Sequence, residues 1–154
     1  MSDEPLDEAA AAAPPAGMIN VVSVQFQATG QLHDFDAGGL PLRNGDRVVV
    51  QVNRGTSLAT VARAPRPIDA RSAAGLPRVT KKADHRELAR EESNLRRAAD
   101  AQRICVHRIR ERRLQMKLIK TECVYDASKM IFYFFSEARV DFRDLVRDLA
   151  QTMH

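Results

Sequence analysis

Apolar and polar positions form their clearest pattern near the carboxyl end of the chain. Residues 130–135, MIFYFF, are apolar or aromatic without a polar break. A run this short and this rich in aromatic residues is typical of a strand that is buried on both faces. From residue 141 the apolar positions change to helical spacing, at i, i+3, i+4, i+7 and i+11. The sequence therefore predicts a helix over 141–153, with Asp141 as its N-cap and with an apolar face of Phe142, Leu145, Val146, Leu149 and Met153.

The preceding residues predict a long helix and a β-hairpin. Asp84 and Glu87 have the spacing of a capping box, which predicts a helix over 84–113. One face of this helix would consist of Leu88, Leu95, Ala98, Ala99, Gln102, Cys105, Val106 and Ile109. Strands at 114–125 and 129–137 then complete an αββα layer over 84–154. Because a two-stranded ribbon is marginal alone, it would continue the N-terminal sheet or receive a strand from beyond residue 154.

The first half of the chain has the short β-branched runs of an antiparallel sheet. Residues 18–63 predict four strands, at 19–27, 32–35, 47–52 and 58–61, separated by turns rich in Gly, Asn and Asp. Consecutive hairpins would make a β-meander that curls into a small half-open barrel, so the whole chain is predicted to be α+β. Residues 1–17, made largely of Ala, Pro and acids, are expected to be a disordered tail.

Positive charge is concentrated in a predicted Pro-containing linker at 64–83. The chain carries a net charge of +4, and the four acids of residues 1–17, with no base beside them, leave +8 on the remainder. Six bases lie in or beside the linker, and we call them the basic set: Arg63, Arg66, Arg71, Arg78, Lys81 and Lys82. A flexible basic segment can bind phosphates without reading bases, but it can equally be a solvated linker. No aromatic residue interleaves these bases, so a stacking platform for single strands is missing.

A second group of charges lies between the last predicted strand and the last helix. We call residues 137–143 the elbow; its charged members are Glu137, Arg139, Asp141 and Arg143. Here charges crowd against an apolar block, and any of them that were buried would have to pair. The elbow could be a structural clamp that fixes the strand-to-helix angle, or it could be a recognition surface for a partner.

No catalytic or metal-binding motif is present, so we expect neither an enzyme nor a metal protein. The nucleotide-binding, hydrolase and metalloprotease signatures are absent. The histidines are scattered, and Cys105 and Cys123, far apart and outside any CxxC, are predicted to be small core residues. Free cysteines and an acidic start without an export signal favour a reduced cytoplasmic protein, and no apolar run is long enough to span a membrane.

The segment from Tyr125 to Ala150 resembles the C-terminal domain of the polymerase-suppressor-protein (PSP) family, which in bacteria includes the YaaT/RicT-type regulators. The resemblance extends back through residues 114–118, 54–55 and 45–50. It implies a cytoplasmic complex that assists ribonuclease-dependent RNA maturation and influences sporulation and developmental signalling. Family members continue past this point with a further strand and a cysteine-bearing tail. The iron–sulfur cluster that the family implies would depend on that tail, so we expect no cofactor in the present span.

Two functional hypotheses follow from these observations. The first is a non-enzymatic cytoplasmic adaptor that docks partner proteins, as the resemblance implies. The second is direct binding of RNA or DNA through the basic set and the long helix, which the positive charge favours. A hydrolase or transferase has no residue that could be named as its nucleophile or base.

Overall fold

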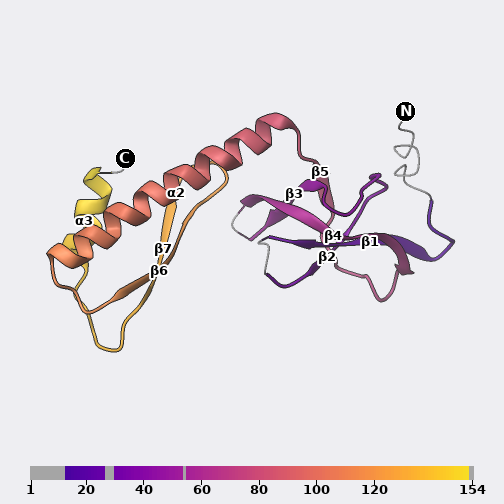
Figure 1. Ribbon diagram of the computed structural model, residues 1–154. Helices are drawn as coiled ribbons and strands as arrows, with labels where there is room; N and C mark the ends of the chain where they lie inside the picture. The colour runs from indigo at the N-terminus through magenta and orange to yellow at the C-terminus, as the bar shows by residue number, and fades with distance from the viewer. Residues whose placement is uncertain (1–12, 27–29, 54, 153–154) are drawn as a thin grey trace. The chain divides into compact units, whose positions relative to one another are not determined.

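A computed structural model describes residues 13–26, 30–53 and 55–152, and it confirms the predicted α+β class. The chain divides into two compact units, Met1–Leu88 and Ala89–His154, and each is described by itself below. The first contains β1 to β5 and the start of helix α2; the second contains the rest of α2, the strands β6 and β7, and helix α3 (Figure 1).

The first unit is a five-stranded antiparallel sheet. Its strands are β1 (Met18–Gln25), β2 (His33–Asp36), β3 (Arg47–Val52), β4 (Gly55–Asp69) and β5 (Val79–Lys82). They lie in the order β2-β1-β4-β3-β5, so β2 and β3 are not neighbours and the predicted meander of consecutive hairpins is wrong. The reason is the long pairing of β1 with β4, which inserts these two strands between β2 and β3.

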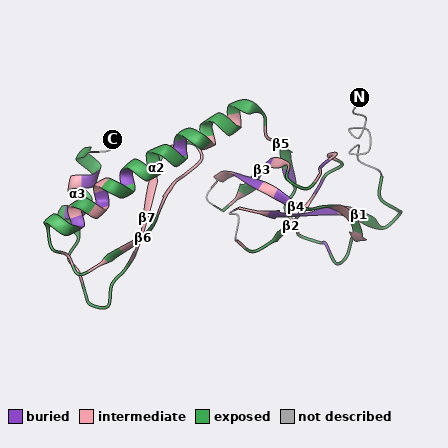
Figure 2. Cartoon of the chain, viewed as in Figure 1, coloured by how far each residue is buried: buried purple, intermediate pink, exposed green. Residues whose placement is uncertain are grey.

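Buried side chains on one face of this sheet form the core of the first unit. Its members are Val22, Val24, Phe35, Ala37, Leu42, Val48, Val50, Ala59, Val61 and Val79. Figure 2 shows the buried positions along the strands. The edge strands approach each other at one point, where the amide of Asp36 donates to the carbonyl of Pro77 over 2.8 Å. The sheet therefore curls without closing into a barrel.

The predicted linker over 64–83 differs in the structure. Its first six residues complete β4, and its last residues contain β5, with turns between them. The sequence prediction had placed Pro65 and Pro67 in this linker. Beyond Val61, however, β4 pairs only with β1, so its other side is an edge at which a missing amide hydrogen costs little.

Several predictions fall wholly or partly outside the described residues. Among them are residues 1–12 of the expected tail, Gln27 at the end of the first predicted strand, Ala28 and Thr29 of the turn after it, Arg54 and Met153. Within the described part of the tail, the carbonyl of Pro15 accepts a hydrogen bond from the amide of Met18 at 3.0 Å. The predicted turn at 36–39 is confirmed, with positive φ at Gly38 and Gly39.

Helix α2 (His85–Glu111) begins at the predicted capping box. The Glu87 amide donates to Asp84 Oδ1 at 3.0 Å, and the Asp84 amide donates to Glu87 Oε1 at 2.8 Å. The buried face of α2 is narrower than predicted and consists of Asn94, Ala98, Ala101, Cys105 and Ile109. Leu88 and Leu95, which were predicted to be buried, are exposed, because the partners of α2 lie about a quarter-turn further round the helix.

The strands β6 (Lys117–Cys123) and β7 (Met130–Phe135) form a separate two-stranded antiparallel sheet. The prediction that the aromatic strand is buried on both faces is wrong. Phe132 and Phe134 pack on the core of the second unit, whereas Phe135, on the opposite face, is 52% exposed. One face of the ribbon packs on the core formed with the helices, and on the other face Ile131 and Tyr133 are half-buried.

Helix α3 (Arg143–Thr152) closes the core of the second unit. Leu145 and Leu149 from α3 pack with Cys105 and Ile109 from α2. The predicted members Phe142 and Val146 are exposed instead, so the buried stripe of α3 is narrow. Arg112 ties the end of α2 to α3, since its Nε donates to Asp148 Oδ2 at 2.9 Å.

Candidate interaction surfaces

The basic set lies on two strands and on the turns between them. Arg63 and Arg66 are on β4, Lys81 and Lys82 are on β5, and Arg71 and Arg78 are in the intervening segment. The set is therefore held on a folded sheet, whereas the sequence suggested a flexible segment. Within the first unit, this placement brings the bases near acids from other strands.

Arg66 is part of a polar network on β1, β2 and β4. Its Nη2 donates to the hydroxyl of Ser23 at 3.1 Å, and its Nη1 donates to the carbonyl of Val21 at 3.3 Å. The Ser23 hydroxyl in turn donates to Asp34 Oδ1 at 2.6 Å, and Ser23 is only 2% exposed. The guanidinium is thus engaged in satisfying buried polar groups, which leaves it little capacity to bind phosphate.

Three more members of the basic set form ion pairs. Arg78 and Lys82 pair with acids far away in the sequence, and Lys81 pairs with acids a few residues away. Arg78 pairs with Asp36 at 3.9 Å, and Lys82 pairs with Asp46 at 3.4 Å. Lys81 lies 3.2 Å from Glu87 and 3.4 Å from Asp84, and the hydrogen bond with Glu87 is the main reason that the pKa of Lys81 is raised. The segment that looked most one-signed in the sequence is therefore largely charge-paired in the fold.

Arg63 and Arg71 are the two members of the basic set for which the described part of the chain shows no ion pair. Both are exposed. The backbone amide of Arg71 donates to Asp69 Oδ1 at 2.8 Å and so stabilises the turn after β4. The Arg71 guanidinium takes no part in this hydrogen bond. If the first unit binds an anion through this set, these two side chains are the most accessible to it.

The elbow is a surface feature. Glu137, Arg139, Asp141 and Arg143 are all exposed, so the partial burial that would have forced them to pair does not occur. Asp141 and Arg143 nevertheless form a two-point ion pair, from Arg143 Nη2 to Asp141 Oδ2 at 2.7 Å and from Nε to Oδ1 at 3.0 Å. Asp141 Oδ1 also accepts the amide of Arg143 at 3.2 Å, so this side chain satisfies a backbone donor at the start of α3.

The Asp141–Arg143 pair predicts a measurable titration. The Arg143 side chain holds the pKa of Asp141 at about 2, below its usual 3.8. A lowered pKa means that the pair stabilises the fold above the unfolded-state pKa and that this contribution disappears as the pH falls towards 2. We expect Arg143→Gln, or high salt, to return the carboxyl pKa towards 3.8 in an NMR titration. An unchanged Asp141 pKa in Arg143→Gln would contradict this prediction, and Arg139→Gln is the matched control.

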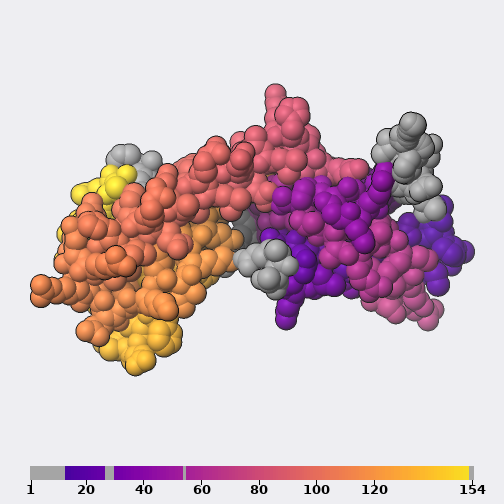
Figure 3. Space-filling model, in the orientation of Figure 1, coloured from indigo at the N-terminus to yellow at the C-terminus, as the bar shows by residue number. Residues whose placement is uncertain are grey.

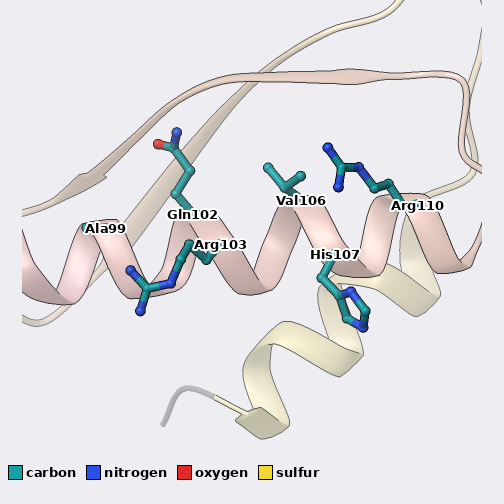
Figure 4. A pocket seen from close by; sticks show the side chains of 6 residues that line it. All are labelled: Ala99, Gln102, Arg103, Val106, His107 and Arg110. Atoms are coloured by element: carbon teal, nitrogen blue, oxygen red, sulfur yellow. The ribbon is translucent and has the colours of Figure 1, made fainter.

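Helix α2 carries a second surface on the side next to its buried face. Six residues line an open pocket of about 510 Å³, and we call them the α2 stripe: Ala99, Gln102, Arg103, Val106, His107 and Arg110. They recur at helical spacing, so they follow one another up successive turns (Figure 4). Much of α2 lies on the face turned to the viewer in the space-filling view (Figure 3). Sequence reasoning assigned Ala99, Gln102 and Val106 to the core, because their periodicity is the same as that of the buried residues beside them.

The two thiols do not fit an iron–sulfur cluster. Cys105 is fully buried in the core of the second unit, and burial raises the pKa of its thiol to about 11. Burial also raises the pKa of the Cys123 thiol, on β6. Burial thus disfavours the thiolate form of both side chains. Within the described ranges, no three His, Cys, Asp or Glu side chains are grouped so that they could hold a metal ion.

Among the helices of the described ranges, none is long and apolar enough to cross a membrane.

Comparison with known proteins identifies the family. The PSP1 C-terminal conserved region matches residues 77–154, which include β5 and the whole second unit. The chain belongs to the PSP1 family. Its PSP1 region contains α2, the ribbon and α3, and it therefore includes the α2 stripe and the elbow. Arg63, Arg66 and Arg71 lie outside the matched region.

Two relatives of this PSP1 chain extend the comparison. It is 37% identical over 134 residues to the stage 0 sporulation protein YaaT of Bacillus subtilis, covering 86% of this chain and 49% of that protein. It is 35% identical over 72 residues to an uncharacterised protein of Schizosaccharomyces pombe, covering 47% of this chain and 10% of that protein. The chain thus spans half or less of the length of these relatives. No solved structure matches it.

Proposed function

We propose that this PSP1-family chain is a non-enzymatic cytoplasmic regulatory adaptor that docks partner proteins. The complex that it serves would act in ribonuclease-assisted RNA maturation or in developmental signalling of the sporulation type. The family match carries the proposal, together with the similarity to a protein named for sporulation.

The surface of the second unit supports docking of proteins. It exposes large apolar side chains on α2, on both strands of the ribbon, and on and just before α3: Leu95, Ile119, Phe135, Val146 and Phe142. Exposed apolar side chains of this size contribute to protein interaction sites where they lie next to one another. The Phe142 ring also stacks on that of Phe134, with centroids 6.4 Å apart. This contact orders the Phe142 side chain, so a partner that binds it loses little side-chain conformational entropy.

A pull-down with and without nuclease tests the proposal. We expect the chain to recover the same protein partners from a lysate of its own organism whether or not the lysate is treated with ribonuclease and deoxyribonuclease. Recovery should survive in moderate salt, because apolar contacts are not screened. Loss of every partner after nuclease treatment would contradict the adaptor function and favour nucleic-acid binding. A variant with residues 89–154 deleted is the control for nonspecific capture.

Direct nucleic-acid binding is the second candidate, and the net charge of +8 on residues 18–154 favours it. Since four members of the basic set have acidic partners, the effect of charge reversal should be uneven. We expect Arg63→Glu and Arg71→Glu to weaken RNA binding more than Lys82→Glu, whose base pairs with Asp46. Removal of one phosphate interaction should reduce the slope of log K against log salt by roughly 0.7 to 0.9. An unchanged slope in the Arg63→Glu, Arg71→Glu double variant would rule out the basic set as an RNA site.

A further inference from the structure

We propose that the α2 stripe is the docking site for an acidic amphipathic helix of a partner protein. This inference rests on the proposed adaptor function and assigns it a place on the chain. The stripe lies wholly in the second unit, within the PSP1 region. Its centre is made of the small or apolar side chains Ala99 and Val106, and Leu95, one turn earlier, is 64% exposed.

The geometry of the stripe suits a helix. Its residues are separated by three or four positions, so their side chains form ridges and grooves of the kind that interlock when two helices pack. The distance along α2 from Leu95, which precedes the stripe, to Arg110 at its end is about 22 Å at 1.5 Å per residue. This length matches four turns of a partner helix. Ala99 at the centre leaves space for close approach. A partner helix would bury Leu95 and Val106, which the fold leaves wholly or partly open to water.

The charge of the stripe indicates an acidic occupant. Arg103, His107 and Arg110 border the apolar centre, and no acid is among the six lining residues. Asp100 partly neutralises Arg103 from the outer side of the helix, and Glu111 Oε2 lies 3.3 Å from His107 Nε2. In the described ranges, Arg110 forms no ion pair. In the close view, Gln102, Val106 and Arg110 leave α2 on one side, and Arg103 and His107 leave it on the other (Figure 4). Carboxylates on the flank of a partner helix that faces Arg103 and Arg110 would meet these cations.

Two other occupants fit less well. A second copy of this chain would bring the same cations face to face, because the lining residues offer no acid in return. Single-stranded RNA would meet an apolar centre without an aromatic side chain on which bases could stack. An acidic helix satisfies both the apolar and the charged parts of the stripe.

A binding assay with designed peptides tests the inference. The probe is a helix-stabilised peptide of about 20 residues with Leu at i, i+3, i+4 and i+7 and Glu on both flanks, and its counterpart has Lys in place of Glu. We expect the acidic peptide to bind the full chain by fluorescence anisotropy at least about tenfold more tightly than the basic one. Val106→Glu and Arg110→Glu should each weaken it by about tenfold or more. Ser93→Glu and Arg97→Glu, about 140° further round α2, are the matched controls and should change affinity less than about twofold.

The remaining outcomes overturn the inference. These are equal binding of both peptides, binding of neither, and equal effects of the stripe and control variants. Binding of a short single-stranded RNA that Val106→Glu abolishes, with no peptide binding, would assign the stripe to nucleic acid. Concentration-dependent self-association that Val106→Glu abolishes would assign it to a second copy. Far-UV circular dichroism and the melting temperature establish that each variant is folded.

The pull-down separates failure of this inference from failure of the adaptor function. If the wild-type chain recovers nuclease-resistant partners and folded Val106→Glu recovers the same ones, the docking site lies elsewhere and the adaptor function stands. If the wild-type chain recovers none, the adaptor function fails whatever the peptides do.

Discussion

Phe35→Ala should destabilise the first unit by about 3 to 5 kcal/mol, the usual cost of removing a buried phenyl ring. Phe35 lies on the edge strand β2, yet it is only 4% exposed and packs in the core formed by β1, β3 and β4. Its ring also lies edge-on to that of Phe26, with centroids 6.4 Å apart. The variant therefore removes an aromatic pair and leaves a cavity beside the shortest strands of the sheet.

Hydrogen exchange followed by mass spectrometry can assign this effect to the first unit. We expect peptides from β1 and β4 to exchange much faster in Phe35→Ala, while peptides from α3 keep their wild-type rates, because the two units have separate cores. Leu32→Ala is the control, since that side chain is 47% exposed and its removal should cost less than about 0.5 kcal/mol. Wild-type exchange in β1 of Phe35→Ala would show that the ring is not part of the core.

Leu145→Ala should destabilise the second unit by about 2 to 5 kcal/mol. Leu145 is 1% exposed and is the largest of the fully buried side chains among the described residues. It lies where α3 meets α2 and the aromatic face of the ribbon, in a core with few fully buried members. Few neighbours can move to fill the space, so the cavity should persist and α3 should detach first.

Tyrosine fluorescence reports on this unit alone. The chain contains two tyrosines and no tryptophan, and both tyrosines, Tyr125 and Tyr133, lie in the second unit. We expect the urea midpoint measured by tyrosine emission to fall markedly in Leu145→Ala and to remain unchanged in Val146→Ala, whose side chain is 53% exposed. Equal midpoints for the two variants would refute the assignment of the buried face of α3.

Features that depend on neighbours in the sequence could be predicted well. The capping box of Asp84 and Glu87 forms as expected because both hydrogen bonds join residues within one helical turn. The turn at Gly38 and Gly39 follows from a backbone conformation that glycine adopts without strain. The periodicity also located α2, α3 and both strands of the ribbon, although it could not tell which apolar positions would find a partner.

Features that depend on distant neighbours could not be predicted. Residues 64–83 were predicted to be a Pro-containing linker, and only the pairing with β1 shows that residues 64–69 belong to β4. The basic set appeared unneutralised because its acids, Asp34, Asp36 and Asp46, lie on other strands or turns. The α2 stripe has the same periodicity as the buried face beside it, so the sequence could not separate a docking surface from a core.

The sequence by itself determined the α+β class, the family, the helix start at Asp84 and the aromatic strand over 130–135, because these follow from local propensity, spacing and motif. Only the tertiary structure decided the strand order β2-β1-β4-β3-β5, the pairing of Arg66 with Ser23 and Asp34, and the partial exposure of Val106 beside buried Cys105. Each of these depends on which surfaces meet when the chain folds. That outcome depends on the packing of residues far apart in sequence. The spacing of apolar positions along the chain does not reveal it.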